Sequence, residues 1–152
     1  MKKLLLAALA CLALMGCAPQ TEYTVSFEGR EKDRALVVES IAEWNACGVA
    51  HLSLVNDDGA DVVITHVDDT YSEELFTHPG ILGMTTTADF SPALVKYKST
   101  RPTRTQPTLT HEMGHAMGLH HADAGVMVPN SYAYPNKSDH VTASDCEALR
   151  NR

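Results

Sequence analysis

Apolar and polar residues alternate along residues 22–27, which predicts a β-strand because successive strand side chains point to opposite faces. The spacing then changes to that of a helix. Residues 31–46 carry large apolar side chains three and four positions apart, so we expect a helix whose buried face includes Val37, Ile41 and Trp44. Gly48 is placed to end that helix.

Four further β-rich segments follow, at residues 50–55, 61–67, 81–87 and 93–97. A polar turn at residues 56–59 separates the first two, and Ser91-Pro92 separates the last two. The order strand, helix, strand, strand at the start predicts a mixed sheet with a helix on one face. Residues 81–87 are the candidate for an edge strand of that sheet.

Two helices are expected in the last third of the chain. A helix over residues 106–117 is predicted from Thr105 as N-cap and Pro107 in the first turn. A shorter helix over residues 142–150 begins at a threonine cap. We therefore predict an α+β fold, with a twisted mixed sheet of about five strands, two helices packed against it and a short C-terminal helix.

The helix predicted over residues 106–117 carries the first part of a metal-binding pattern. Residues four apart on an α-helix are rotated by only about 40°, so His111 and His115 project from one face and can converge on one ion. Gly118 can take the left-handed conformation that ends a helix and so bring His121 to the metal. Three histidines with an open position for water form the ligand set of a catalytic zinc site.

Glu112 lies beside the first ligand and is the predicted general base and acid. Its carboxylate can accept a proton from the attacking water and later pass it to the leaving amine. A bare His-Glu-x-x-His match arises by chance in about one in fifty chains this rich in histidine, and adding Gly118 and His121 at fixed offsets lowers that frequency to roughly one in 10⁴ or less. His120 adjoins the third ligand, and the spacing leaves it at the rim.

The pattern over residues 111–121 resembles the zinc motif of the metzincin clan of metallopeptidases. Residues 125–129 look like the Met-turn of that clan, in which Met127 would form an apolar floor beneath the zinc. Astacins and serralysins typically have a tyrosine where this chain has Pro129, whereas matrixins have a proline, so the matrixin-like branch is the closer resemblance. The resemblance implies a metzincin-like catalytic domain with one catalytic zinc ion.

Other parts of the chain resemble matrixins less specifically. Trp44 and residues 142–145 look like the end of the first matrixin helix and the start of the last one, and Asp145 would then hydrogen-bond to the Met-turn. A convincing copy of the family's structural zinc and calcium ligands is missing. We interpret the remaining candidates as solvated groups, namely His66 and His78 for zinc, and Asp57, Asp58, Asp61, Asp68 and Asp69 for calcium.

The N-terminus is typical of an exported protein. Lys2-Lys3 precedes an apolar run over residues 4–15 that is too short to span a bilayer. Residues 14–17, Leu-Met-Gly-Cys, resemble the lipobox of bacterial lipoproteins, in which the cysteine, here Cys17, is acylated and becomes the first mature residue.

The alternative is an ordinary secretory signal cleaved after Gly16 or Ala18, and export follows from either. In a Gram-negative lipoprotein, Ala18 after the cysteine would favour the outer membrane. We expect a signal peptide at residues 1–16, a lipid-attached tether at residues 17–22 and a catalytic domain at residues 23–152. The expected location is a bacterial outer membrane or cell surface, or otherwise the periplasm or the medium.

Net charge narrows the range of partners. The formal charge of −7 becomes −9 once residues 1–16 are removed, because that segment holds two lysines and no acid. An acidic single domain argues against nucleic acid or a polybasic membrane patch as partner. We therefore expect a monomer that attaches to a membrane only through lipid.

Two cysteines remain for a disulfide. Cys11 leaves with the signal and Cys17 is the acylation site, which leaves Cys47 and Cys146 as a pair in an oxidising compartment. Their bond would contribute up to about 4 kcal/mol in the chain-entropy model, since the closed loop is long. The alternative is two unrelated buried thiols.

These observations together predict a zinc-dependent endopeptidase. In the metzincin clan the peptide lies extended along an edge strand, for which residues 81–86 are the candidate. Residues 129–135, with Tyr132 and Tyr134, would form the outer wall of the pocket for the side chain after the cut. Two alternatives stay open: a zinc- or partner-binding lipoprotein without turnover, and a cell-wall amide hydrolase.

Overall fold

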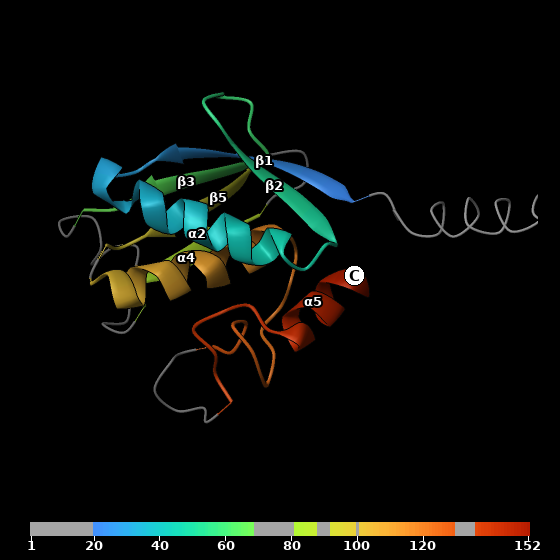
Figure 1. Cartoon of the computed structure of the whole chain (residues 1–152). Helices are drawn as coiled ribbons and strands as arrows, with labels where there is room; N and C mark the ends of the chain where they lie inside the picture. Colours follow the sequence, from blue (N-terminus) through green and yellow to red (C-terminus); the bar gives the residue numbers. More distant parts are fainter. Residues whose placement is uncertain (1–19, 69–80, 88–91, 100, 130–135) are drawn as a thin grey trace, which may run out of the picture.

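The computed structural model describes residues 20–68, 81–87, 92–99, 101–129 and 136–152. It has the predicted α+β architecture, a mixed sheet with helices α2 and α4 on one face and the short helix α5 beyond them (Figure 1). The strands are β1 (Thr21–Glu28), β2 (Ala50–Val55), β3 (Val62–His66), β4 (Gly83–Thr86) and β5 (Ala93–Tyr97). The helices are α2 (Arg34–Asn45), α4 (Pro102–Ala116) and α5 (Ala143–Arg150), with a 3-10 turn η1 (Glu31–Asp33) before α2.

The five strands form one sheet in the order β2-β1-β3-β5-β4. Four strands are parallel, with Val25 aligned to Val62 and Ile64 aligned to Val95, while β4 runs antiparallel to β5. The segment predicted as an edge strand is therefore an edge strand. None of the helices in the described ranges has the length and apolarity that crossing a lipid bilayer requires.

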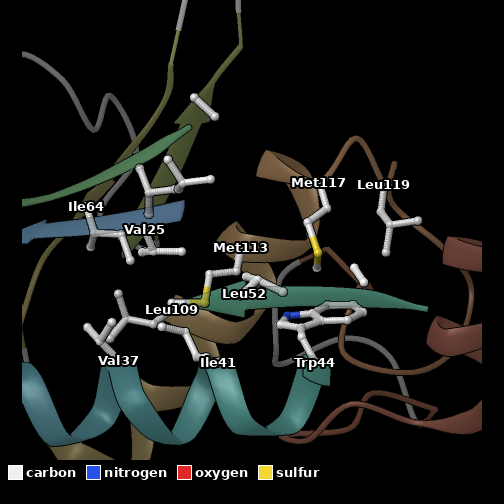
Figure 2. Close-up of a cluster of buried hydrophobic side chains, with 14 of the residues drawn as sticks. Val25, Val37, Ile41, Trp44, Leu52, Ile64, Leu109, Met113, Met117 and Leu119 are labelled. Carbon is white, nitrogen blue, oxygen red and sulfur yellow. The ribbon is translucent and has the colours of Figure 1, made fainter. Parts of the chain in front are cut away.

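The core lies between the sheet and the two longer helices. Val37, Ile41 and Trp44 of α2 are buried, as the helical spacing predicted, and point toward the sheet and α4 (Figure 2). From α4 and its end, Leu109, Met113 and Met117 pack into the same cluster. Because α4 is anchored on this side, its other side is available for the histidines.

The start of α2 differs from the prediction. Residues 31–33 form a 3-10 turn rather than the first α-helical turn. The carboxylate of Asp33 makes no cap hydrogen bond, because it is directed to the hydroxyl of Tyr97, 3.1 Å away, and to Arg30. A tertiary contact thus replaces the local cap.

The start of α4 was also predicted wrongly. The helix begins at Pro102, four residues before the predicted start, with Arg101 as N-cap. Pro102 fits the first helical position, where its missing N–H would have no partner. Thr105 is not a cap, because its hydroxyl lies inside the helix, 3.2 Å from the carbonyl oxygen of Arg101.

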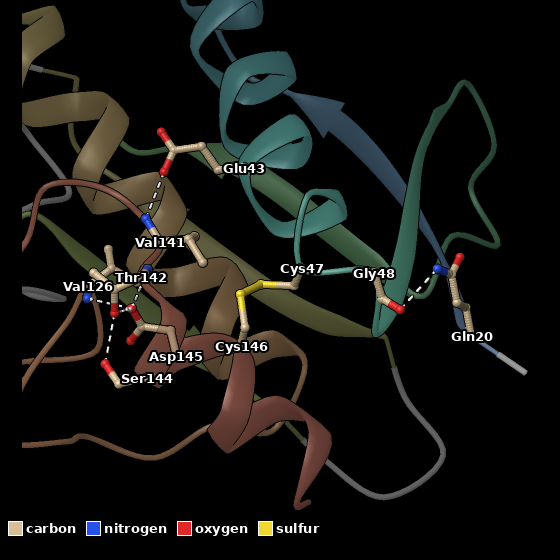
Figure 3. Close-up of a disulfide and its surroundings, with 10 residues drawn as sticks. All are labelled: Gln20, Glu43, Cys47, Gly48, Val126, Val141, Thr142, Ser144, Asp145 and Cys146. Atoms are coloured by element: carbon tan, nitrogen blue, oxygen red, sulfur yellow. Dashed lines mark hydrogen bonds between the residues drawn. A yellow bond between two sulfur atoms is a disulfide. The ribbon is translucent and has the colours of Figure 1, made fainter. Parts of the chain in front are cut away.

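Helix α5 is joined to the end of α2. The structure contains the expected disulfide between Cys47 and Cys146, which are 99 positions apart (Figure 3). Thr142 is the N-cap, as predicted, in a capping box with Asp145. The disulfide and the cap fix the orientation of α5, and with it the side chain of Asp145.

Candidate metal centre

His111 and His115 face the same point in space from neighbouring turns of α4. Their Nε2 atoms lie 3.1 Å apart. In a tetrahedral site with zinc–nitrogen bonds of about 2.0 Å, two ligand nitrogens lie about 3.3 Å apart. The helix therefore places the two nitrogens at the separation that one metal ion requires.

The other ring nitrogen of each histidine is held by a backbone carbonyl. The Nδ1 atom of His111 lies 2.7 Å from the oxygen of Val126, and that of His115 lies 2.7 Å from the oxygen of Leu119. Because a carbonyl only accepts hydrogen bonds, Nδ1 carries the proton and Nε2 is left with its lone pair. Burial also lowers the pKa of His111 to about 4. Two facing lone pairs repel each other unless a cation lies between them.

His121 completes the group. Gly118, at a φ of 86°, ends α4 and turns the chain back toward the ligands. The potential ligand atoms of His111, His115 and His121 all lie within 4.8 Å of one another. In the part of the chain that the structure describes, these three residues are the group that could hold a metal ion. Partial loss of hydration, together with the nearby His115 and His120, lowers the pKa of His121 as well, which favours the neutral form that binds metals.

The segment beneath the histidines is Val126-Met127, the predicted Met-turn. Met127 is buried against α4 at Gly114, where any side chain would collide with its sulfur atom. The carboxylate of Asp145 is only 2% exposed and accepts a hydrogen bond from the backbone N–H of Val126 at 3.1 Å (Figure 3). It also accepts one from the backbone N–H of Met127 at 3.3 Å. Asp145 thus holds the turn whose Val126 carbonyl in turn fixes the ring of His111.

Trp44 connects α2 to the same helix. Its indole N–H donates to the carbonyl oxygen of Thr110 at 2.9 Å, one residue before the first histidine. Its ring packs beside Gly114. Helix α2 therefore supports α4 at the two positions next to the metal-facing histidines.

Glu112 lies next to the histidine group and is only 6% exposed. This burial raises the pKa of its carboxyl group to about 7, because the charged form loses hydration. The Thr85 hydroxyl, 2.6 Å from Oε2, partly offsets that loss by donating a hydrogen bond. A carboxylate with a pKa near neutrality can both accept and donate a proton.

Gly83 and Thr85 lie in the segment predicted as the edge strand, but the sequence interpretation missed their contacts with Glu112. Both belong to the edge strand β4, which packs against α4. A Cβ atom at Gly83 would lie 2.7 Å from Cγ of Glu112 and 2.6 Å from a methyl group of Thr108. The only available signal was a glycine inside a strand, which often marks a close approach by another part of the chain.

These groups line an open cleft with a volume of about 350 Å³. One wall is the edge strand, the other is the turn after α4, and the floor holds the histidines and the carboxylate. The lining residues include Gly83, Met84, Thr85, His111, Glu112, His115, His120 and His121. The exposed His120 lies at the rim of this cleft.

Several predicted residues lie away from the centre or outside the described ranges. His66 lies 3.4 Å from Asp68, and Asp57 and Asp61 accept hydrogen bonds from Gly59 and Thr24. The expected signal segment and the expected acylation site, Cys17, lie outside the described residues, as do His78, Asp69, Tyr132 and Tyr134.

Comparison with known protein families finds a match to part of the chain. The sequence profile of the family described as Peptidase M66 matches residues 98–144, which span α4, the three histidines, Met127 and the start of the last helix. The match supports a peptidase, and its span contains every residue of the candidate metal centre except the supporting residues on β4, α2 and α5. No curated protein matches the chain.

Proposed function

We propose that this protein is a zinc-dependent endopeptidase with His111, His115 and His121 as metal ligands and Glu112 as general base and acid. One observation carries this proposal. The buried Glu112 lies beside the Nε2 atoms of His111 and His115, which are 3.1 Å apart, in a cleft that opens along an edge strand. The peptidase M66 match over the same residues supports the reaction class. Three imidazoles fit zinc because borderline-soft nitrogen ligands suit that ion.

Zinc bound by these ligands supplies Lewis acidity, which polarises a carbonyl group and makes a water molecule more acidic. The protein supplies the proton transfers. The Glu112 carboxylate takes a proton from the attacking water and returns it to the amine that leaves, so the peptide bond is broken with no net change in the enzyme. Thr85 fixes the carboxylate by holding Oε2, which leaves Oε1 for the water.

The proposed substrate is an unfolded or extended peptide segment. Among the described strands, β4 pairs only with β5, and its residues line the cleft. A peptide added at the other side would continue the sheet by main-chain hydrogen bonds and place one carbonyl group above the histidines. This mode of binding recognises the backbone, so the sequence preference would come from side-chain pockets.

We also propose that the enzyme is a matrixin-like metzincin that works outside the cytoplasm, anchored through an acylated Cys17. Three features of the sequence support this proposal: Gly118, the turn with Met127 and Pro129, and the lipobox-like residues 14–17. The Cys47–Cys146 disulfide is consistent with an oxidising compartment.

The test is cleavage of unfolded casein by the purified mature protein, with peptidoglycan assayed in parallel. We expect casein to be cut, a chelator to stop the cleavage, and zinc to restore it. Cleavage of peptidoglycan alone would replace the proposal with an amide hydrolase. Zinc binding without cleavage of casein, peptidoglycan or a broad peptide library would indicate a non-catalytic binding protein.

A further inference from the structure

The last turn of α4 leaves backbone carbonyls without helical partners, as every helix end does. Three of them are satisfied by the turn that follows: Met113 accepts from Met117, Gly114 from Leu119, and His115 from Gly118, at 2.8 to 3.0 Å. The carbonyl of Met117, further along, accepts instead from a distant residue, because Nη1 of Arg152 donates to it.

Arg152 is also held from a second direction. The same Nη1 donates to the hydroxyl oxygen of Tyr23 on β1 at 3.0 Å. The guanidinium lies directly against the turn, since a Cβ atom at Gly118 would be 2.5 Å from its Cζ. Arg152 therefore connects the first strand to the end of the metal-binding helix.

The turn that Arg152 contacts determines the positions of two metal ligands. Leu119, two residues beyond Met117, provides the carbonyl that holds Nδ1 of His115 at 2.7 Å. His121 follows two residues later on the same turn. A shift of the Met117 carbonyl would therefore move both His115 on the helix and His121 on the turn after it.

We propose that Arg152 is a positioning residue for the metal centre, acting by capping the C-terminus of α4. A cation at this end of a helix is favoured by the helix dipole, and a guanidinium can bond a carbonyl while packing flat against the chain. This inference rests on the proposed function, because it concerns the ligands of the proposed zinc ion.

Arg150 provides a matched control. It is an exposed arginine two residues earlier, in the last turn of α5, so its removal changes net charge by the same amount. Arg152→Lys keeps a donor able to reach a carbonyl but loses the planar group that fits against Gly118. The three variants Arg152→Ala, Arg152→Lys and Arg150→Ala separate capping from charge.

The experiment measures zinc affinity by competition with a chelating dye, and the visible absorption spectrum of the cobalt-substituted protein. Supporting groups of metal ligands typically contribute 10-fold to 100-fold to affinity, so we expect Arg152→Ala to bind zinc about 10-fold more weakly than wild type. The cobalt spectrum should change in Arg152→Ala, Arg152→Lys should recover part of the affinity, and Arg150→Ala should match wild type.

Two results would overturn the inference. Arg152→Ala could bind zinc and give a cobalt spectrum indistinguishable from those of Arg150→Ala. The other result is that zinc-free Arg152→Ala unfolds at a lower temperature than wild type and that this loss of stability explains its whole loss of zinc affinity. The role of Arg152 would then be purely structural. If wild type itself binds no zinc, the proposed function fails instead, so the two failures are distinguishable.

Discussion

The two helical histidines and the third histidine are held in place by different means. His111 and His115 are spaced by the backbone of α4, and their rings are fixed by carbonyl oxygens at 2.7 Å. His121 is exposed and lies beyond a glycine with positive φ, in a segment joined to the Met-turn by the hydrogen bond from Ala122 to Met127. Helix α4 thus sets the spacing of two of the three histidines, while the position of the third depends on contacts between distant parts of the chain.

The largest effect is expected from removing a helical ligand. His115→Ala should weaken zinc binding by on the order of 10³-fold, since zinc sites gain several kcal/mol from each of a few ligands. Zinc content after dialysis against a mild chelator measures this. The control is His120→Ala, which removes an exposed histidine beside the third ligand and should keep the metal. Equal zinc loss in both variants would refute the ligand assignment.

A smaller effect is expected at the turn. Gly118→Ala forces a side chain into the left-handed region and against Arg152, so we expect zinc affinity to fall about 10-fold to 100-fold. The control is Gly59→Ala in the exposed turn before β3, where a Cβ atom makes only an ordinary 3.6 Å contact. Titration with a zinc-sensitive dye measures the zinc affinity of both variants. Unchanged affinity in Gly118→Ala would show that the turn accommodates the added side chain.

Next in size is the support beneath the centre. Asp145→Asn removes the charged acceptor shared by Val126, Met127 and Thr142, which should cost about 1–3 kcal/mol in the free energy of unfolding. Zinc affinity should fall less than in Gly118→Ala, because the change reaches His111 only through the Val126 carbonyl that holds its Nδ1. Denaturant unfolding of the variant is compared with that of Glu147→Gln, an exposed position on the same helix. Equal stability of the two variants would contradict the role of Asp145.

The smallest effect on zinc affinity is expected from loss of the disulfide. A disulfide acts mainly on the unfolded chain, so the double variant Cys47→Ser with Cys146→Ser should lose about 2–5 kcal/mol of stability yet bind zinc within a few-fold of wild type. Unfolding and zinc titration are measured on the same sample. A 100-fold loss of zinc affinity in the folded variant would mean that the disulfide holds the centre directly.

The parts of the fold that follow local patterns were predictable. Strands β2 and β5 have the predicted bounds, and the apolar spacing of α2 identified its buried face. The start of α4 was not predictable in this way, because both Thr105 and Pro102 carry a start signal and the local sequence does not choose between them.

The candidate metal centre likewise has a part that follows local sequence patterns and a part that does not. The positions of His111, His115 and Glu112 follow from spacing within one helix, and the structure places all three side chains in one cleft. Thr85, Gly83 and Arg152 lie 25 or more positions away from the groups they contact, and apart from the glycine inside a strand no local pattern indicates these contacts. Residues that support a site from other elements are therefore the hardest part of the site to predict from the sequence.

The most direct test of the account is Glu112→Gln, assayed for bound zinc and for casein cleavage on the same preparation. The account predicts one zinc per protein in both wild type and variant, with cleavage reduced by about 10²-fold to 10⁴-fold in the variant, because the amide cannot accept the proton of the attacking water. Cleavage at the wild-type rate, or loss of zinc together with activity, would contradict the assignment of Glu112 as a base that acts beside the metal rather than as a ligand.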